Sequence, residues 1–323
     1  MSAPASTTSS SASGLQAGYI QPRRRGMTMR RREMIDCYIF ILPAVLGLLI
    51  FYLGPMVASL YFSMTDYDML SPATWVGLEN YRTLMHDAIF WKSLRVTVTY
   101  SVFSVPLVLG LALFLALLLN QKFRGVTAYR TIFYLPTVMS GVAVATLWKW
   151  IFNPDFGILN LLLEKIGIHG PAWLADETWA LPALILTSLW TAGGSMLIFL
   201  AGLQSIPNDL YEAAELDGAG IWNRFRNITL PLLSHVTFFN LVLGIIGALQ
   251  VFTEAFVLTR GGPNNSTMLL SVYLYQNAFQ YLKMGYASAI AWAMFLIVMV
   301  LTLAVFRSAP MWVHYQETQG NAK

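Results

Sequence analysis

Six long apolar stretches constrain the fold of this chain more than any other feature. A helix needs about 20 consecutive apolar residues to cross the hydrocarbon core of a bilayer. Inside lipid each stretch has to satisfy its own backbone hydrogen bonds, and a helix does so within one segment. We therefore expect an all-α polytopic membrane protein with six transmembrane helices. The expected spans are Cys37–Ser63, Val96–Leu119, Thr131–Phe152, Ala180–Leu203, Val236–Leu258 and Ala287–Phe306.

Charged residues are scarce. Of the 323 residues, 56% are hydrophobic and only 11% are charged, whereas a soluble domain carries about 25% charged residues. The shortage indicates that most of the surface faces lipid. The lone Cys37 excludes an internal disulfide and a cysteine-based metal site. The four histidines are scattered along the chain, so we expect neither a metal site nor a catalytic group.

Arginines gather ahead of the first span. Six of them lie between Arg23 and Arg32, and they supply much of the net charge of +4. Because basic residues favour the cytoplasmic side of a membrane, this cluster places the N-terminus in the cytoplasm, and six spans return the C-terminus to the same side. The charge indicates topology and attraction to anionic lipid, not nucleic-acid binding.

These signals divide the chain into three parts. Residues 1–35 are expected to form a disordered basic cytoplasmic tail, since residues 1–20 are rich in Ser, Ala, Thr and Gly. Residues 36–307 form the expected transmembrane domain, and 308–323 a second cytoplasmic tail. A secretory signal peptide also sets a basic segment before an apolar one. Here the apolar stretch is too long and no small-residue cleavage site follows, so we expect a retained first helix.

Three loops are expected on the outer side. In the second, leucines and isoleucine at helical spacing from Leu159 to Ile166 predict a short helix lying on the membrane face. The third opens with the turn sequence Gly261-Gly262-Pro263. The loops run over Thr65–Arg95, Asn153–Thr178 and from Arg260 to about Gly285.

The loop over residues 204–235 is the one sizeable cytoplasmic element that the pattern predicts. Pro207 ends the fourth span, and Asp209 is a suitable N-cap with Glu212 three residues later, as in a capping box. Gly218 and Gly220 provide a helix stop. We expect this hairpin to dock to a partner protein, because so short a helix is only marginally stable alone and docking would order it.

The second arm of the hairpin is expected to be a short helix over Ile221–Ile228. Leu230-Pro231 should then turn the chain back toward the membrane. Tyr211, Trp222 and Phe225 are candidates for anchoring the hairpin. The alternative interpretation is a capped interfacial hairpin in which Glu212 only holds the start of the helix.

The hairpin also carries a family pattern. It resembles the EAA loop of ABC importer permeases, which reads Glu-Ala-Ala, two variable residues, Asp-Gly-Ala, then Phe, Ile and Leu-Pro. The resemblance implies a type I ABC importer permease fold. The matching residues are Glu212, Ala213, Ala214, Asp217, Gly218, Ala219, Phe225, Ile228, Leu230 and Pro231.

In that family the loop is a coupling helix that sits in a cleft of the ATP-hydrolysing subunit. The resemblance therefore implies that Glu212 makes a polar contact with the ATPase. It also implies that Ala213, Ala214 and Gly218 allow close packing and that Asp217 fixes the turn, with Ala219 completing the motif.

Further segments are similar to sugar-importer permeases of the maltose type. They include Tyr134-Leu135-Pro136, Trp75–Tyr81 and Gly261-Gly262-Pro263. This resemblance implies a carbohydrate substrate and a bacterial inner-membrane location. The implied partners are a second, related permease subunit, two ATP-binding cassette subunits and an extracytoplasmic solute-binding protein.

The chain has no Gly-x-x-x-x-Gly-Lys-Ser/Thr phosphate-binding loop. We therefore expect no cofactor in this chain and no enzymatic activity of its own, with ATP and Mg²⁺ bound by the partner ATPase. A solute other than sugar and a stand-alone secondary transporter remain the alternative functions.

The fifth span carries a candidate solute pathway. At 100° per residue its polar and glycine residues cluster on one face, and polar groups inside a bilayer usually face a wet cavity or the bundle interior. Alternatively, the glycines allow close helix packing and the amides make interhelical hydrogen bonds. The candidate residues are Asn240, Gly244, Gly247, Gln250 and Glu254.

Residues close to this candidate pathway carry further expectations. Helical spacing points Phe252 away from the candidate face, and Glu254 lies near the outer end, where Arg260 or Lys149 would pair with it. In the fourth span the run Trp190–Ser195 weakens the helix, as a hinge or for packing, because Gly costs about 1 kcal/mol relative to Ala. Trp148 and Trp150 are assigned to the interfacial aromatic belt rather than to a sugar platform.

Overall fold

The computed structural model describes residues 29–121 and 123–313, and nearly all of the regular structure in them is helical. The chain separates into one unit up to Met56 and a second from Val57 onward. In the first unit, α1 (Met29–Leu48) runs into a π-helical turn, η1 (Leu49–Leu53), and then into the start of α2 (Gly54–Ser63). The first expected span is thereby confirmed as a helix. Of the expected basic tail, residues 1–28 lie outside the described part, and residues 29–35 are helical rather than disordered.

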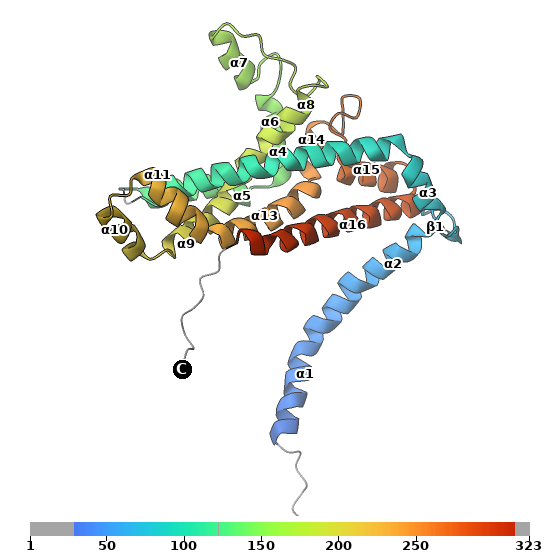
Figure 1. Ribbon diagram of the computed structural model, residues 1–323. Helices are drawn as coiled ribbons and strands as arrows, with labels where there is room; N and C mark the ends of the chain where they lie inside the picture. The colour runs from blue at the N-terminus through green and yellow to red at the C-terminus, as the bar shows by residue number, and fades with distance from the viewer. Residues whose placement is uncertain (1–28, 122, 314–323) are drawn as a thin grey trace, which may run out of the picture. The chain divides into compact units, whose positions relative to one another are not determined.

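The second unit is a helix bundle built around one long helix, α4, against which α9 and α13 pack, while α16 packs against α13 (Figure 1). Its remaining elements are a strand pair, helices and short irregular turns. The elements are β1 (Thr65–Asp66), β2 (Thr74–Trp75), α3 (Glu79–His86), α4 (Ala88–Leu119), α5 (Val126–Val138), α6 (Gly141–Ile151), α7 (Ile158–Lys165), α8 (Ala180–Ser188), η2 (Leu189–Thr191), α9 (Ala192–Gln204), α10 (Asn208–Leu216), α11 (Ile221–Arg224), η3 (Phe225–Thr229), α12 (Leu230–Leu232), α13 (Ser234–Leu249), α14 (Thr253–Leu258), α15 (Leu270–Tyr275), η4 (Gln276–Gln280), α16 (Met284–Ser308) and η5 (Ala309–Met311).

Five helices in the described residues are long and apolar enough to cross a membrane, and a bent pair brings the number to six. The bent pair is the third expected span, which is not one straight helix. α5 and α6 meet at 99°, because Met139 and Ser140 are extended shortly after Pro136, whose missing N–H weakens the helix end. The bend brings α6 against α14.

Two other spans also depart from regular α-helix. The fourth is interrupted by the 3₁₀ turn η2, next to the glycines that were expected to weaken it. The close approach of α5 explains one of them: a Cβ on Gly193 would lie 2.1 Å from the carbonyl oxygen of Phe133. The fifth span ends as a helix at Leu249 and resumes at Thr253.

The loops carry more structure than the sequence predicts. α4 begins at Ala88 rather than at Val96, which shortens the first outer loop. The third outer loop contains α15 and η4, which the apolar pattern did not reveal. The predicted short helix of the second loop is confirmed as α7, and a turn follows Thr259, whose carbonyl accepts from the amide of Gly262 at 2.9 Å.

The hairpin of α10 and α11 lies at one end of α4, and α3 with the strand pair lies at the other (Figure 1). Two buried clusters fill the bundle between these ends. One joins the first half of α4 to α14, α15 and α16, and the other joins its second half to α9 and the hairpin. The hairpin of the predicted cytoplasmic loop and the start of the bundle after the first predicted outer loop therefore lie at opposite ends of α4 (Figure 1).

Asp87 fastens three helices together at the α3 end. Its carboxylate caps α4 by accepting a hydrogen bond from the amide of Ile89 at 2.8 Å, and it accepts the hydroxyls of Tyr273 and Tyr286. Burial raises the pKa of Asp87, but the hydrogen bonds from the two tyrosines and the backbone outweigh it and hold the pKa below its usual 3.8. Burial and the hydrogen bond to Asp87 raise the pKa of Tyr273 to about 12.

We predict that Asp87→Asn lowers the free energy of unfolding by about 1–2 kcal/mol at neutral pH, the low end for charge-assisted hydrogen bonds because the side chain is partly exposed. A lowered folded-state pKa stabilises the fold above the usual pKa, and this contribution is lost as the pH falls through the folded value. Thermal unfolding in detergent should therefore show a constant deficit between about pH 5 and 8 that shrinks in stronger acid. Asp68→Asn, in an exposed turn, is the control and should leave the midpoint nearly unchanged.

Candidate functional site

α10 begins two residues earlier than an N-cap at Asp209 predicts. It starts at Asn208, directly after Pro207, whose backbone angles place it in the N-cap position without a side-chain hydrogen bond. Asp209 is consequently in the first turn and not the cap. The predicted capping box with Glu212 does not form, since neither carboxylate has a hydrogen bond among the described residues. Asp209 still lies in the first turn, near the positive end of the helix dipole, whereas Glu212 lies beyond that turn.

The helix stop at Gly218 is confirmed, and its geometry explains the residue. Gly218 has φ +75°, and its amide donates to the carbonyl of Glu215 at 3.0 Å, while the amide of Ala219 donates to Ala214 at 2.8 Å. This pair of bonds is a Schellman motif, which places a left-handed residue, usually Gly, just beyond the helix end. Gly220 has the separate role of preceding α11 as its N-cap.

The second arm differs from the expected simple helix and turn. α11 covers only Ile221–Arg224 and passes into the π-helical turn η3. Leu230 and Pro231 do not turn the chain, because they lie inside α12, which leads on to α13. The π-helical turn directly before Pro231 offers a reason, since a widened turn accommodates a ring that has no amide to donate.

Internal contacts hold the two arms together. Arg224 and Glu215 form an ion pair at 3.1 Å, and the hydroxyls of Tyr211 and Thr229 share a hydrogen bond at 2.9 Å. Tyr211 and Ile228 also pack against the buried cluster that contains the second half of α4. Tyr211 is therefore the anchor that the sequence suggested, whereas Glu215, Arg224 and Thr229 were missed because no periodic pattern marks contacts across a hairpin.

The tip of the hairpin is apolar and exposed. Leu216, Ile221 and Trp222 are 90%, 80% and 68% exposed, so Trp222 does not anchor the hairpin as expected but faces outward, with its ring centre 5.6 Å from that of Phe225. These three residues are called the apolar tip below. The predicted coupling residues surround it: Glu212, Ala213, Asp217 and Gly218 are exposed, and Ala214 and Ala219 are partly buried.

The candidate pathway residues of the fifth span do not share one continuous helix face. Asn240 is 1% exposed, and its Nδ2 donates to the carbonyl of Val236 at 3.1 Å. A Cβ on Gly244 would lie 3.3 Å from Val105 of α4. The packing interpretation fits Gly244, whereas the Asn240 amide bonds within its own helix and its buried Oδ1 has no hydrogen-bond partner among the described residues. Gly247 borders open space, and with Gly244 it lines a cavity of 190 Å³ that Tyr100, Ser104 and Ser188 also line.

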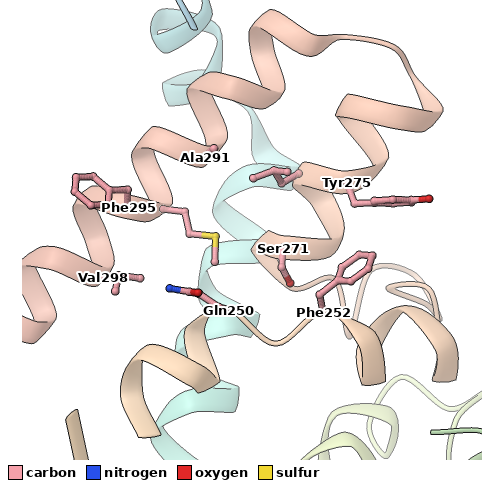
Figure 2. A pocket seen from close by; sticks show the side chains of 9 residues that line it. Gln250, Phe252, Ser271, Tyr275, Ala291, Phe295 and Val298 are labelled. Carbon is pink, nitrogen blue, oxygen red and sulfur yellow. The ribbon is translucent and has the colours of Figure 1, made fainter. Parts of the chain in front are cut away.

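Gln250 lies in a second cavity, of 430 Å³, between the end of α13, α15 and α16 (Figure 2). Phe252 lines the same cavity and does not point away, because the chain is no longer helical at this point and helical spacing does not apply. Ser271 and Tyr275 of α15 complete its polar and aromatic lining, and the hydroxyl of Ser271 donates to the carbonyl of Val251. This cavity brings together an amide, hydroxyls and aromatic rings.

Glu254 has a different environment from the one predicted. It lies in the first turn of α14, and its Oε1 would be 3.7 Å from a Cβ on Gly141 of α6. No ion pair joins it to Arg260 or Lys149 in the part of the chain that the structure describes. The guanidinium of Arg260 instead lies 5.9 Å from the ring centre of Phe256.

The two tryptophans of α6 have separate environments. Trp150 is 52% exposed, as an interfacial residue would be. Trp148 is partly buried and belongs to an internal group of rings, with centres 5.1 Å from Phe152 and 5.8 Å from Trp190. Across the described residues no group of three His, Cys, Asp or Glu side chains is placed to hold a metal ion.

A family model described as "Binding-protein-dependent transport system inner membrane component" matches residues 108–311, which include the hairpin, Gly244, Gly247 and Gln250. The chain belongs to this family. It is therefore an inner-membrane permease of a binding-protein-dependent transport system.

Characterised and probable permeases resemble this permease over most of its length. A probable ABC transporter permease of Bacillus subtilis, YesP, is 47% identical over 90% of this chain and 95% of its own. The lactose transport permease LacF of Rhizobium radiobacter is 36% identical over 87% and 96%. The trehalose/maltose transport permease MalF of Thermococcus litoralis is 35% identical over 86% and 95%.

A solved structure has the same fold. A chain of a bacterial ABC transporter involved in the import of the acidic polysaccharide alginate matches with a TM-score of 0.76 and 28% identity, over 87% of this permease and 96% of that chain. The match extends well beyond the hairpin, so the bent third span and the interrupted fifth span lie within a fold found in a solved importer.

We predict that Gly218→Ala loosens the end of α10, because a non-glycine residue at φ +75° is strained by about 1–2 kcal/mol. Hydrogen exchange should show faster exchange of the amides of Gly218 and Ala219, with the transmembrane helices unchanged. Gly220→Ala is the matched control, since Gly220 has φ −68° and no neighbouring atom within 4 Å. Equal exchange in the two variants would contradict the assigned role of Gly218.

Proposed function

We propose that this permease is a transmembrane subunit of an ATP-driven sugar importer and that its hairpin couples the membrane helices to a separate ATPase. Named relatives that transport lactose and trehalose or maltose support the sugar. A related transporter has been solved in complex with an alginate-loaded periplasmic protein. These relatives favour a sugar over other solutes and an ATP-driven importer over a stand-alone secondary transporter.

The apolar tip is the observation that carries the coupling role. Leu216, Ile221 and Trp222 are more than two-thirds exposed at the end of an otherwise polar hairpin. Large exposed apolar side chains rimmed by polar residues are typical of protein interaction sites. Glu212 and Asp217 supply that rim, and because neither side chain has an internal partner in the described structure, both are available to a second protein.

The hairpin is suited to transmit force as well as to bind. The Glu215–Arg224 ion pair and the Tyr211–Thr229 hydrogen bond fix its two arms. Tyr211 and Ile228 fasten it to the cluster that contains α4 and α9. A displacement of the tip is thereby passed to those helices instead of being absorbed by the loop.

The proposed partners follow from this arrangement. Two ATPase subunits bind ATP and Mg²⁺, because this chain lacks a phosphate-binding loop, and the permease itself catalyses no reaction. A second, related permease supplies the other half of the pathway, and a solute-binding protein delivers the sugar to the α3 end, which faces outward in the proposed orientation. ATP binding closes the ATPases, draws the coupling hairpins together and opens the spans outward, and hydrolysis resets them.

The cavity at Gln250 is the part of this chain best suited to contact a sugar. An amide donates to and accepts from hydroxyls, and Phe252 and Tyr275 present aromatic faces to the apolar side of a sugar ring (Figure 2). Its volume of 430 Å³ is in the range of small-molecule sites. Gly244, by contrast, lies close to Val105 of α4 and serves packing between helices.

We predict that Trp222→Ala weakens binding of the ATPase at least about tenfold, because a buried tryptophan at an interface commonly contributes 2 kcal/mol or more. Glu212→Ala should weaken the coupling in the same assay. The measurements are co-purification of the ATPase from the native membrane and ATP hydrolysis stimulated by the loaded binding protein. Trp150→Ala, at another exposed tryptophan, is the control and should retain the ATPase, and retention by Trp222→Ala would contradict the assignment of the tip.

We predict that Gln250→Leu, similar in size but without the amide, reduces sugar uptake into proteoliposomes at least about fivefold, the effect of losing one or two hydrogen bonds to a solute. The affinity of the separate binding protein for the sugar should not change. Val298→Leu, on the apolar wall of the same cavity, is the control for altered volume. Full sugar uptake by the Gln250→Leu variant would contradict the assignment of this cavity to the sugar pathway.

A further inference from the structure

The short connection from α4 to α5 forms a compact corner with basic and aromatic side chains. We call residues Phe123, Arg124, Tyr129 and Arg130 the basic corner. Val126, within it, packs against the same buried cluster as Tyr211 and Ile228, so the corner lies at the hairpin end of the bundle. Neither the coupling role nor the sugar pathway uses it.

The positive charges of the corner have no acidic partners. Arg130 donates from Nη2 to the carbonyl of Leu119 at 2.8 Å, and its Nε is buried without an acceptor among the described residues. Arg124 is exposed and makes no hydrogen bond or ion pair within the described ranges. Arg224, at the same end of the bundle, is by contrast paired with Glu215. The sequence has no Asp or Glu between Ala88 and Asn153, so no acidic neighbour along the chain offsets the two arginines.

The aromatic side chains place the corner at a membrane boundary. Phe123 and Tyr129 are 42% and 51% exposed, with ring centres 5.8 Å apart, and aromatic residues of this kind collect at the level of lipid headgroups. The apolar side chains that follow on α5 are also exposed, Ile132 at 61% and Leu135 at 57%. Exposed apolar side chains on one side and arginines without acidic partners among the described residues on the other are the arrangement expected at the headgroup layer.

We propose that the basic corner binds the phosphate headgroup of an anionic phospholipid. Its charge is complementary to the phosphate, its rings lie at headgroup level, and the adjoining α5 surface suits acyl chains. A soluble acidic protein or nucleotide matches the charge but leaves the adjacent apolar surface without a partner. The orientation proposed above puts this lipid in the inner leaflet, and the site itself does not depend on the transported solute.

The test uses the assembled transporter in nanodiscs of phosphatidylcholine with increasing phosphatidylglycerol, and counts bound phosphatidylglycerol by native mass spectrometry. Arg124→Gln should lower the affinity for phosphatidylglycerol about fivefold, the effect of one basic contact near an anionic surface. Arg124 makes no internal contact in the described structure, so its loss should leave the fold intact. Arg130→Gln should act in the same direction, with an added loss of stability because Arg130 also holds the end of α4.

Arg307→Gln is the matched control, because Arg307 is exposed near the same end of the bundle, at the end of α16, away from the corner. It should leave phosphatidylglycerol binding unchanged. Equal losses in Arg124→Gln and Arg307→Gln would show general surface attraction and overturn the proposal, as would an unchanged affinity in Arg124→Gln. Displacement of the lipid by millimolar inorganic phosphate would also overturn it, in favour of a site for free phosphate.

Discussion

The need to satisfy backbone hydrogen bonds inside a bilayer governs this structure. α4 meets it by running as one helix of 32 residues from end to end of the bundle. In the fourth and fifth spans a neighbouring element covers part of each departure from regular helix, whereas Met139 and Ser140, at the bend between α5 and α6, are exposed. The Ser271 hydroxyl donates to the free carbonyl of Val251 where α13 has ended, and α5 lies in backbone contact with Gly193 just beyond the 3₁₀ turn of the fourth span. Irregular backbone therefore lies partly against neighbouring helices and partly, at the bend between α5 and α6, at an exposed surface.

The sequence predicted the membrane spans well because hydropathy accumulates over some 20 residues. It predicted the Gly218 stop because a single residue type serves a left-handed helix end. It did not predict the bend between α5 and α6, which depends on the extended pair Met139 and Ser140 and on packing against α14. The contacts of Asp87 were also missed, since its tyrosine partners lie nearly 200 residues further on, at sequence separations of 186 and 199.

In the candidate site, too, the sequence predicted some features and missed others. The coupling residues are a proposal that rests on a sequence motif. The structure adds what a motif omits: the ion pair and the hydroxyl hydrogen bond that fix the hairpin, and an apolar tip beside the acidic residues. In the fifth span a helical wheel grouped Asn240, Gly244 and Gln250, yet helix termination at Gln250 separates them. Side-chain periodicity is informative only while the helix continues. An apolar sequence does not show where the helix ends.

The unbroken α4 has a mechanical consequence. It contributes to both buried clusters. One lies beside the hairpin, and the other lies beside the hydrogen bonds of Asp87. The third, fourth and fifth spans are interrupted by the bend, the 3₁₀ turn and the gap after α13, whereas α4 continues as one α-helix through its internal Pro106. We therefore expect relative movement within the bundle to occur as rotation of the half-helices about those three interruptions. α4 is expected to stay one continuous helix against which they move.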